Sequence, residues 1–413
     1  MHYEGVVEPD FLTVANQFVQ QIADDGRSGA ALCVYFRGKP VMDIWAGKKD
    51  HEGNNWQSDT LVNGFSTTKG VASTLVHILA EQGLLDYRAP IAEYWPEFGC
   101  YGKENIRLSH VLCHQSGLHR LRPLIDDARK MTNWPTMVEV LASASVSPLP
   151  ARCSAYQALT YGWLVGEVIQ RVTGLSFAEA LAKWITVPLE LNGIWVGLPD
   201  SEMHRRALLA GFPAQCSDPG IRMSSSRARP TSWKKSLQRM IVTQGFRLAG
   251  ADWQESKAAL APKGIRRFSF NDAQVVQSCI PAANGMFTAR DLAKMYAMVA
   301  EGGELGTVSL LSPEHIRRMG QICVTGPDKV LPVNMQWRQG YHRVFTTGWR
   351  MPSAFGHFGW GGSGAWCDPV NRLAMGYMVN NHHGTSPAGD LRIMSLNKRI
   401  MESASAVRRR AWV

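Results

Sequence analysis

The sequence lacks a cysteine framework, a long apolar run and an N-terminal leader. Its eight cysteines stand at positions 33, 100, 113, 153, 216, 279, 323 and 367, with no CxxC pair among them. This spacing predicts reduced, mostly buried thiols, as in a cytosolic protein. The first residues lack a basic region followed by an apolar core, and no segment has the roughly 18 apolar residues of a membrane span. We therefore expect a cytoplasmic protein without a membrane partner.

Two motifs of other hydrolase classes are also missing. The absence of a GxSxG elbow does not exclude a serine hydrolase, because that motif belongs to a different esterase fold. No HExxH pattern occurs either, and no clear third carboxylate ligand can be named. Zinc is therefore the weaker interpretation of the one local cluster of possible ligands, which comprises His110, Cys113, His114 and His119. We expect neither a metal ion nor an organic cofactor.

The composition is that of an ordinary folded enzyme. Of the 413 residues, 45% are hydrophobic and 19% are charged, which is enough to bury a core and to form two subdomains. The formal charge is +10, yet the basic residues are scattered except at 222–235 and 408–410. A solvated surface explains this charge better than nucleic acid binding does. We expect a small-molecule partner and no nucleic acid, and the sequence leaves a homo-oligomer open.

The stretch from Asn63 to Gly70 reads Asn-Gly-Phe-Ser-Thr-Thr-Lys-Gly and precedes a helical pattern of apolar residues that begins at Val71. Ser66 and Lys69 are then three apart in the first turn and share one face of the helix. Burial and nearby positive potential lower the pKa of such a lysine from its usual value of about 10.4, so its amine can accept the serine proton. The helix N-terminus also favours negative charge beside it. The arrangement therefore predicts a nucleophile for acyl transfer.

The Ser-x-x-Lys spacing alone is weak evidence, because it occurs three times in this chain and chance supplies roughly one copy. The copy from Ser232 to Lys235 lies in a basic stretch that we interpret as a loop, and the copy from Ser395 to Lys398 lies within a polar C-terminal helix. Only Ser66 follows an expected strand-to-helix junction flanked by glycines. We therefore assign the nucleophile to Ser66.

Periodicity predicts strands at both ends of the chain and helices in the middle. Apolar runs at 30–36 and 40–46 flank a turn and predict a β-hairpin, and further strand-like runs lie at 345–349, 364–367 and 373–380. Helices are expected at 108–113, 137–143, 159–172 and 177–186, with a last one from about 388 to 403.

This order favours an α/β (α+β) fold with two parts. Residues 1–95 and 280–413 are expected to form one domain, an antiparallel sheet flanked by helices. Residues 96–279 are expected to form an inserted, mainly helical domain, whose segment at about 201–279 makes a variable wall over the cleft. Such a cleft between the two parts exposes Ser66.

Three elements follow one another along the chain: Ser66 to Lys69, Tyr156-Gln157-Ala158 and His357-Phe358-Gly359. In type, order and separation they resemble the signature elements of the serine β-lactamase and penicillin-recognising superfamily. More closely, the chain resembles the β-lactamase-like carboxylesterases of lipolytic family VIII. Supporting stretches lie at 108–118, 161–174 and 284–293, so the resemblance spans nearly the whole chain. It implies a β-lactamase/transpeptidase-like fold.

The resemblance assigns a chemical role to Tyr156, which spacing alone does not. It implies that this phenol, with a lowered pKa, partners Lys69, takes the proton from Ser66, passes it to the leaving group and later activates water. It also implies that the third element lies on a strand at the edge of the cleft. There Gly359 lets the backbone approach the substrate closely, and the N–H groups of Ser66 and Trp360 form an oxyanion hole.

The third element has two interpretations, because Trp360-Gly361-Gly362 also matches a form of it seen in some of these esterases. Counted back from Asp368-Pro369, His357 stands where the family's motif usually begins. We therefore favour His357-Phe358-Gly359 as the substrate-binding element. A triad with His357 as the base for Ser66 is a further alternative, although the sequence offers no acidic partner for it.

Two differences from the antibiotic-hydrolysing relatives indicate the substrate. His357 replaces a lysine that holds a substrate carboxylate, and Ala158 replaces an asparagine that holds an amide carbonyl. Ester hydrolysis makes fewer demands on the site, because an alkoxide leaves more easily than an amine. We therefore expect a serine carboxylesterase for short- to medium-chain or aryl esters. Four tryptophans are candidates for an apolar acyl pocket or for the core: Trp163, Trp253, Trp360 and Trp366.

Other functions remain open on the same fold. An acyltransferase passes the acyl group to an alcohol or an amine, and a weak β-lactamase or D,D-peptidase uses the same serine. A non-catalytic sensor binds a ligand in the cleft without turnover. Retention of Ser66, Lys69 and Tyr156 argues against the sensor.

Overall fold

The predicted hairpin opens a large sheet. The computed structural model describes residues 2–216, 244–246, 248–348, 350–382, 385–386 and 389–410. Strands β2 (Gly29–Phe36) and β3 (Lys39–Gly47) pair antiparallel, which confirms the hairpin. Arg37 and Gly38 join them with φ angles of 52° and 75°. Two successive left-handed residues match the twist of the flanking strands, which explains the tightness of this turn.

Seven strands from both ends of the chain form the sheet. Their order is β1-β3-β2-β12-β11-β10-β9, and each neighbouring pair is antiparallel. The remaining five strands are β1 (Glu4–Val7), β9 (His342–Arg343), β10 (Phe355–Phe358), β11 (Gly364–Asp368) and β12 (Leu373–Val379). The expected antiparallel sheet is confirmed, while the domain boundaries at 95 and 280 stay a prediction.

The strand predicted at 345–349 is wrong. Residues 345–348 form no strand, and Trp349 lies outside the described residues. The strand lies a little earlier, at His342–Arg343, where it pairs with Phe355 and Gly356 of β10. The side chain of Phe345 instead lines a cavity. Aromatic residues suit a half-buried strand and a cavity wall equally well, so the run at 345–349 did not distinguish the two.

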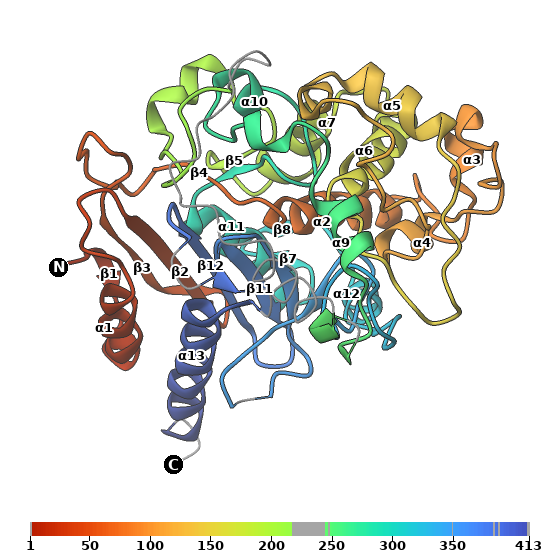
Figure 1. Cartoon of the computed structure of the whole chain (residues 1–413). Coiled ribbons are helices and arrows are strands. Elements are labelled where there is room, and N and C mark those ends of the chain that lie inside the picture. The colour runs from red at the N-terminus through yellow and green to blue at the C-terminus, as the bar shows by residue number, and fades with distance from the viewer. Residues whose placement is uncertain are drawn as a thin grey trace.

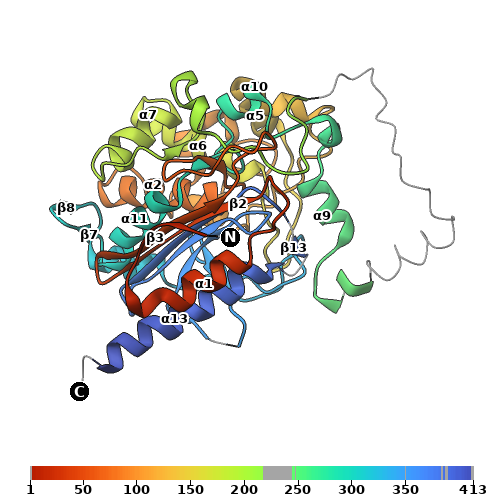
Figure 2. The same ribbon diagram turned by 90° about the vertical axis from the view of Figure 1, so that its left-hand side faces the viewer.

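Helices cover both faces of the sheet (Figures 1 and 2). On one face, α1 (Leu12–Gln20) and α13 (Leu391–Arg410) lie side by side, and α11 (Ala289–Ala300) packs against β2, β11 and β12 on the other. Alternate residues of β2 face the two layers, because side chains of a strand point to opposite sides in turn. Leu32 and Val34 contribute to the core under α1 and α13, whereas Cys33 joins the core on the α11 side.

The middle of the chain is helical, as expected. Its main helices are α2 (Thr67–Glu81), α3 (Ile91–Tyr94), α4 (Leu108–Leu112), α5 (Trp134–Ser143), α6 (Thr160–Thr173) and α7 (Phe177–Leu181), which continues as a π-helical turn over Ala182–Thr186. Local sequence explains where α5 begins and where α6 ends. The Asn133 side chain caps α5 by accepting from the Thr136 N–H at 2.9 Å, and Gly174 ends α6 with φ of 68°.

Shorter elements complete the chain. They are the helices α9 (Trp253–Leu260), α10 (Ala273–Gln277) and α12 (Pro313–Met319), the small sheet of β4 (Val62–Asn63), β6 (Met286–Phe287) and β5 (Ile194–Trp195), and the pairs β7 (Glu304–Leu305) with β8 (Val308–Ser309) and β13 (Thr385–Ser386) with β14 (Gly389–Asp390).

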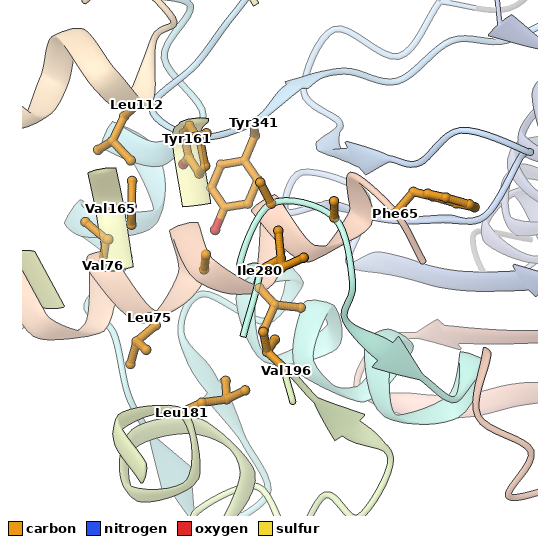
Figure 3. Packing of buried hydrophobic residues seen from close by; sticks show 14 of the residues in the cluster. Phe65, Leu75, Val76, Leu112, Tyr161, Val165, Leu181, Val196, Ile280 and Tyr341 are labelled. Carbon is orange, nitrogen blue, oxygen red and sulfur yellow. The ribbon is translucent and has the colours of Figure 1, made fainter. Parts of the chain in front are cut away.

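Helix α2 runs through the larger hydrophobic core (Figure 3). All its residues from Thr67 to Leu79 are buried, including Leu75 and Val76, and the helix packs against α6 and α7. A helix that is buried all round holds its first turn rigidly against the neighbouring elements. The N-terminal end of α2 is therefore a firm base for a functional group.

The cysteines are free thiols, as expected, although only four of the eight are buried: Cys33, Cys113, Cys153 and Cys367. Across the ranges that the structure describes, no helix combines the length and the apolar character needed to cross a bilayer.

Candidate active site

Ser66 stands between β4 and α2, one residue ahead of the first helical residue Thr67. It is thus the N-cap of the helix and not part of its first turn, a small shift from the expectation. Phe65 precedes it with φ of +46°, a left-handed conformation that a bulky side chain adopts at a cost. The Asn63 side chain holds this turn by accepting from the Phe65 N–H at 2.7 Å. Ser66 is half-buried at this turn and lines a cavity.

Lys69 is fully buried and reaches Ser66 as predicted. Its Nζ lies 3.0 Å from the Ser66 Oγ, and it donates to the carbonyl oxygens of Ala158 at 2.7 Å and Ala282 at 2.8 Å. Burial lowers the pKa of Lys69 well below its ordinary value, and no carboxylate pairs with it among the described residues. A neutral amine has two N–H groups, which the two carbonyls engage, and its lone pair is then free to accept the Ser66 proton.

Tyr156 completes a three-residue cluster at the serine. Its hydroxyl donates to the Ser66 Oγ at 2.7 Å, so Ser66 lies between the phenol and the amine. The lowered pKa that the resemblance implies for this phenol is wrong for the free protein. Burial raises the pKa of Tyr156 above its ordinary value, the hydrogen bond to Ser66 lowers it in part, and the carboxylate of Asp328 raises it further. Tyr156 is therefore a protonated donor in this state.

Trp337 supports Tyr156 and was not identified from the sequence. The two rings stack with centroids 5.5 Å apart and an interplanar angle of 9°. His114 meets both rings edge-on, at 4.9 Å from Tyr156 and 4.2 Å from Trp337. No local pattern links positions 156 and 337, so only their packing reveals the relationship. The phenol is thereby held in one orientation.

The third element lies on β10, and its histidine is buried beside the serine. His357 lines the same cavity as Ser66 and Tyr156, with only 2% of its surface exposed. Burial lowers the pKa of His357 well below its ordinary value. Within the described part of the chain, its Nδ1 contacts the Phe358 carbonyl and its Nε2 has no partner. This geometry does not support His357 as the base for Ser66.

The chain after His357 passes close to the serine. A Cβ on Gly359 would lie 2.0 Å from the Gly64 carbonyl oxygen, so only glycine fits there. Trp360 is 53% exposed, and its ring packs edge-on against Phe65 at 5.5 Å. Over the residues described, the backbone amides of Ser66 and Trp360 donate to no other protein group.

A cavity of about 750 Å³ opens over Ser66 and Tyr156. Its walls are mostly apolar and include Phe246, Trp253, Leu260, Val330, Leu331, Val333, Met335, Phe345, Phe358, Trp360, Ile393 and Met394. Of the four candidate tryptophans, Trp253 and Trp360 line this cavity, whereas Trp163 and Trp366 are fully buried and belong to the core. The cavity size falls within the range of about 300–1,000 Å³ that is typical of small-molecule sites.

The competing candidates have structural roles or lie elsewhere. Ser232 and Lys235 lie outside the described residues. Lys398 pairs with Glu402 on the surface of α13, and Ser395 contacts Gln17 and Gln21. Where the structure describes the chain, no three His, Cys, Asp or Glu side chains are placed to hold a metal ion, and His114 instead accepts a hydrogen bond from the Gln157 N–H at 3.2 Å.

Known proteins are similar to this chain over nearly its whole length. A family model described as Beta-lactamase matches residues 14–396. The chain is 33% identical over 421 residues to "Esterase/beta-lactamase LipL" of Mycobacterium tuberculosis (strain ATCC 25618 / H37Rv), covering 99% of this chain and 90% of that protein.

Two solved structures are similar in fold and sequence. A family VIII carboxylesterase matches with a TM-score of 0.78 and 29% identity. A penicillin-binding protein homologue from Caulobacter crescentus matches with a TM-score of 0.79 and 31% identity. Each match covers 98% of this chain and 100% of the other.

Proposed function

The chain belongs to the beta-lactamase family, and from this premise we propose that it is a serine carboxylesterase for short- to medium-chain or aryl esters. One observation carries the proposal: the Ser66 hydroxyl lies between the amine of Lys69 and the phenol of Tyr156 at the base of an apolar cavity. This arrangement provides a nucleophile, a base and an acid within hydrogen-bonding distance of one another.

Acylation begins at the Lys69–Ser66 pair. The neutral amine of Lys69 takes the Ser66 proton while Oγ attacks the ester carbonyl carbon, and negative charge develops on the carbonyl oxygen. The free N–H groups of Ser66 and Trp360 are the donors that we assign to this oxyanion. The tetrahedral intermediate then collapses and the C–O bond to the alcohol breaks.

Tyr156 serves the leaving group. Its protonated phenol donates to the departing alkoxide, and the proton on Lys69 replaces the one that the phenol gives up. A water molecule then attacks the acyl-enzyme, with the same pair accepting its proton. Ser66 regains its hydrogen and the acid leaves. A raised pKa of Tyr156 suits this role, because the phenol keeps its proton until an alkoxide, a stronger base, requires it.

The cavity supports an uncharged ester as substrate. Its walls carry Val333, Met335 and Ile393, and its histidine at the third element, His357, is buried with a lowered pKa. A neutral imidazole offers little attraction to the carboxylate of a β-lactam. The amide-binding asparagine of the antibiotic-hydrolysing relatives is also replaced, by Ala158, whose carbonyl accepts from Lys69.

Weak β-lactam hydrolysis at the same serine is the second candidate. It is favoured by the relative at 33% identity, which is named as both an esterase and a beta-lactamase. The acyl-enzyme chemistry is shared, so the two activities differ in how the substrate is held and in the leaving group.

The test compares wild type with Ser66→Ala on short p-nitrophenyl esters and on nitrocefin, with intact-mass spectrometry to detect a covalent adduct. We expect ester turnover that is lost in the variant, an adduct of acyl mass on the wild type alone, and little nitrocefin cleavage. Ester turnover that survives in Ser66→Ala would remove this serine from the mechanism. Strong cleavage of nitrocefin that depends on Ser66 would favour the second candidate, and an adduct that never hydrolyses would favour a sensor.

A further inference from the structure

Asp328 is a buried carboxylate that accepts five hydrogen bonds and has no ion-pair partner in the described ranges. Only 1% of its surface is exposed. Its Oδ1 accepts from three backbone N–H groups, those of Tyr156 at 3.2 Å, Val330 at 2.8 Å and Leu331 at 3.0 Å. Its Oδ2 accepts from the Ser154 hydroxyl at 2.7 Å and from the Trp337 indole at 3.1 Å. A buried charge is tolerated when it is hydrogen-bonded this completely.

One side of this network holds the catalytic phenol. The carboxylate binds the backbone of Tyr156 and also the indole that stacks on the Tyr156 ring. Asp328 therefore restrains both the backbone of Tyr156 and the indole of Trp337, on which the Tyr156 ring stacks. Ser154 adds a third attachment in the same segment, where its backbone also pairs with the 327–329 segment.

The other side holds the wall of the cavity. Val330 and Leu331, whose N–H groups the same oxygen accepts, both line the space above Ser66. Asp328 lies 172 residues from Tyr156 in sequence, and Val330 and Leu331 follow Asp328 closely, so no local geometry relates this part of the wall to Tyr156. Asp328 is the group that touches both.

We propose that Asp328 is a positioning residue for the reaction, which aligns the acyl group lying against Val330 and Leu331 with the hydroxyl of Tyr156. The inference rests on the esterase function proposed above. Asp328 contacts neither Ser66 nor the cavity itself, and it acts by keeping the acyl wall and the phenol in one fixed relation.

A carboxylate suits this position better than an amide does. All five partners are donors, and a carboxylate is an acceptor only. In Asp328→Asn one oxygen can keep the three backbone N–H groups, but the new NH₂ group then faces the Trp337 indole N–H, and two donors repel each other. Asparagine has nearly the same shape as aspartate. The substitution therefore acts mainly on the contact between residue 328 and the Trp337 indole.

The test measures kcat and KM for p-nitrophenyl acetate and p-nitrophenyl octanoate in the full-length protein. We expect Asp328→Asn to lower kcat about 10- to 100-fold, because a displacement of about 1 Å at a reacting centre costs about 10²-fold in rate. We also expect the octanoate-to-acetate ratio of kcat/KM to fall, because the longer acyl group depends more on the wall. The double variant Asp328→Asn with Trp337→Phe removes the opposing donor, and we expect it to recover part of the lost kcat.

Asp368→Asn is the matched control for stability. Asp368 is also fully buried and accepts from a serine hydroxyl, that of Ser353, and from backbone N–H groups, those of Val370 and Asn371, but none of these partners lines the cavity. We expect it to lower the melting temperature without changing the substrate ratio. If Asp328→Asn does not fold, Ser154→Ala is the second variant, because it removes one donor and leaves the carboxylate. We expect it to lower the octanoate-to-acetate ratio of kcat/KM by a smaller factor.

The outcomes separate this inference from the proposed function. An Asp328→Asn enzyme with wild-type kcat and an unchanged substrate ratio would refute the positioning role. The positioning role would also be refuted if the activity lost in Asp328→Asn only follows the fall in its melting temperature, as in the control Asp368→Asn. Failure of the esterase function itself appears elsewhere, as ester turnover that persists in Ser66→Ala.

Discussion

The Lys69 nitrogen lies 3.0 Å from the Ser66 hydroxyl oxygen, and the lysine has no exposed surface. The carbonyls of Ala158 and Ala282 receive the two N–H groups that a neutral amine offers. This pairing gives the site a base whose proton affinity depends on burial and not on a neighbouring acid.

Lys69→Arg tests the base directly. A guanidinium does not lose its proton in proteins, so it cannot accept one from Ser66. We expect kcat/KM for p-nitrophenyl butyrate to fall by about 10²- to 10⁴-fold. Lys103→Arg is the control, because Lys103 is also buried and donates to two carbonyls, those of Ala142 and Ala144, far from the serine in sequence. Equal losses in the two variants would point to folding and not to proton transfer.

The pH dependence of activity follows from the same lysine. Because burial lowers the pKa of Lys69, its neutral form is present at lower pH than for a free lysine. We expect kcat/KM to fall as the pH drops through that lowered pKa. Tyr156, whose pKa is raised, should add no alkaline limb below the ordinary phenol value of about 10. An alkaline limb near neutral pH, absent from Tyr156→Phe, would contradict the protonated phenol.

Stability should rise with pH over a related window. Between the lowered pKa of Lys69 in the folded protein and about 10.4 in the unfolded chain, the unfolded state binds more protons. The free energy of unfolding should therefore increase with pH in this window, and Lys69→Met should flatten the slope. Urea titrations at several pH values measure it. A slope that is the same in both proteins would show that Lys69 is charged in the folded state.

Tyr156→Phe isolates the phenol hydroxyl. The ring keeps its stack on Trp337, so the melting temperature should change little, whereas the leaving group loses its acid. We expect kcat to fall by about 10²- to 10⁴-fold with little change in KM. Tyr87→Phe removes another buried hydroxyl, one that contacts His77 at 2.7 Å, and should leave the kinetics near wild type. A Tyr156→Phe enzyme that turns over normally would exclude this tyrosine.

Gly359→Ala tests the close approach beside the serine. The new methyl would lie 2.0 Å from the Gly64 carbonyl oxygen, so the end of β10 must move relative to Ser66. A shift of about 1 Å at a reacting centre costs about 10²-fold in rate. Gly320→Ala is the control, since its nearest neighbour is 3.5 Å away and its φ is −74°. Full activity in Gly359→Ala would argue against this segment as the oxyanion strand.

Val333→Trp tests whether the cavity holds the acyl group. Val333 is half-buried on the cavity wall, and an indole there would fill space above Ser66. In wild type we expect kcat/KM to rise about fourfold per methylene from acetate to butyrate, from about 0.8 kcal/mol per buried CH₂. The variant should lose more activity on octanoate than on acetate. An unchanged profile across chain lengths would place the acyl group elsewhere.

The sequence by itself determined the features that depend on neighbours a few residues apart. Ser66 and Lys69 meet because residues three apart share a helix face, and the hairpin turn at Arg37-Gly38 follows from short-range backbone geometry. The resemblance to a known family identified Tyr156 and the third element as candidate site residues. The fold that this resemblance implied is the fold observed.

Only the tertiary structure decided the environment of these groups. The stack of Trp337 on Tyr156 and the carboxylate of Asp328 join segments more than 170 residues apart, which no periodicity encodes. The same packing reversed the expected direction of the Tyr156 pKa, because burial disfavours a charged phenol more than the Ser66 hydrogen bond favours it. Residue spacing along a chain determines which groups can meet, whereas solvent exclusion by distant segments determines which protonation state they hold when they do.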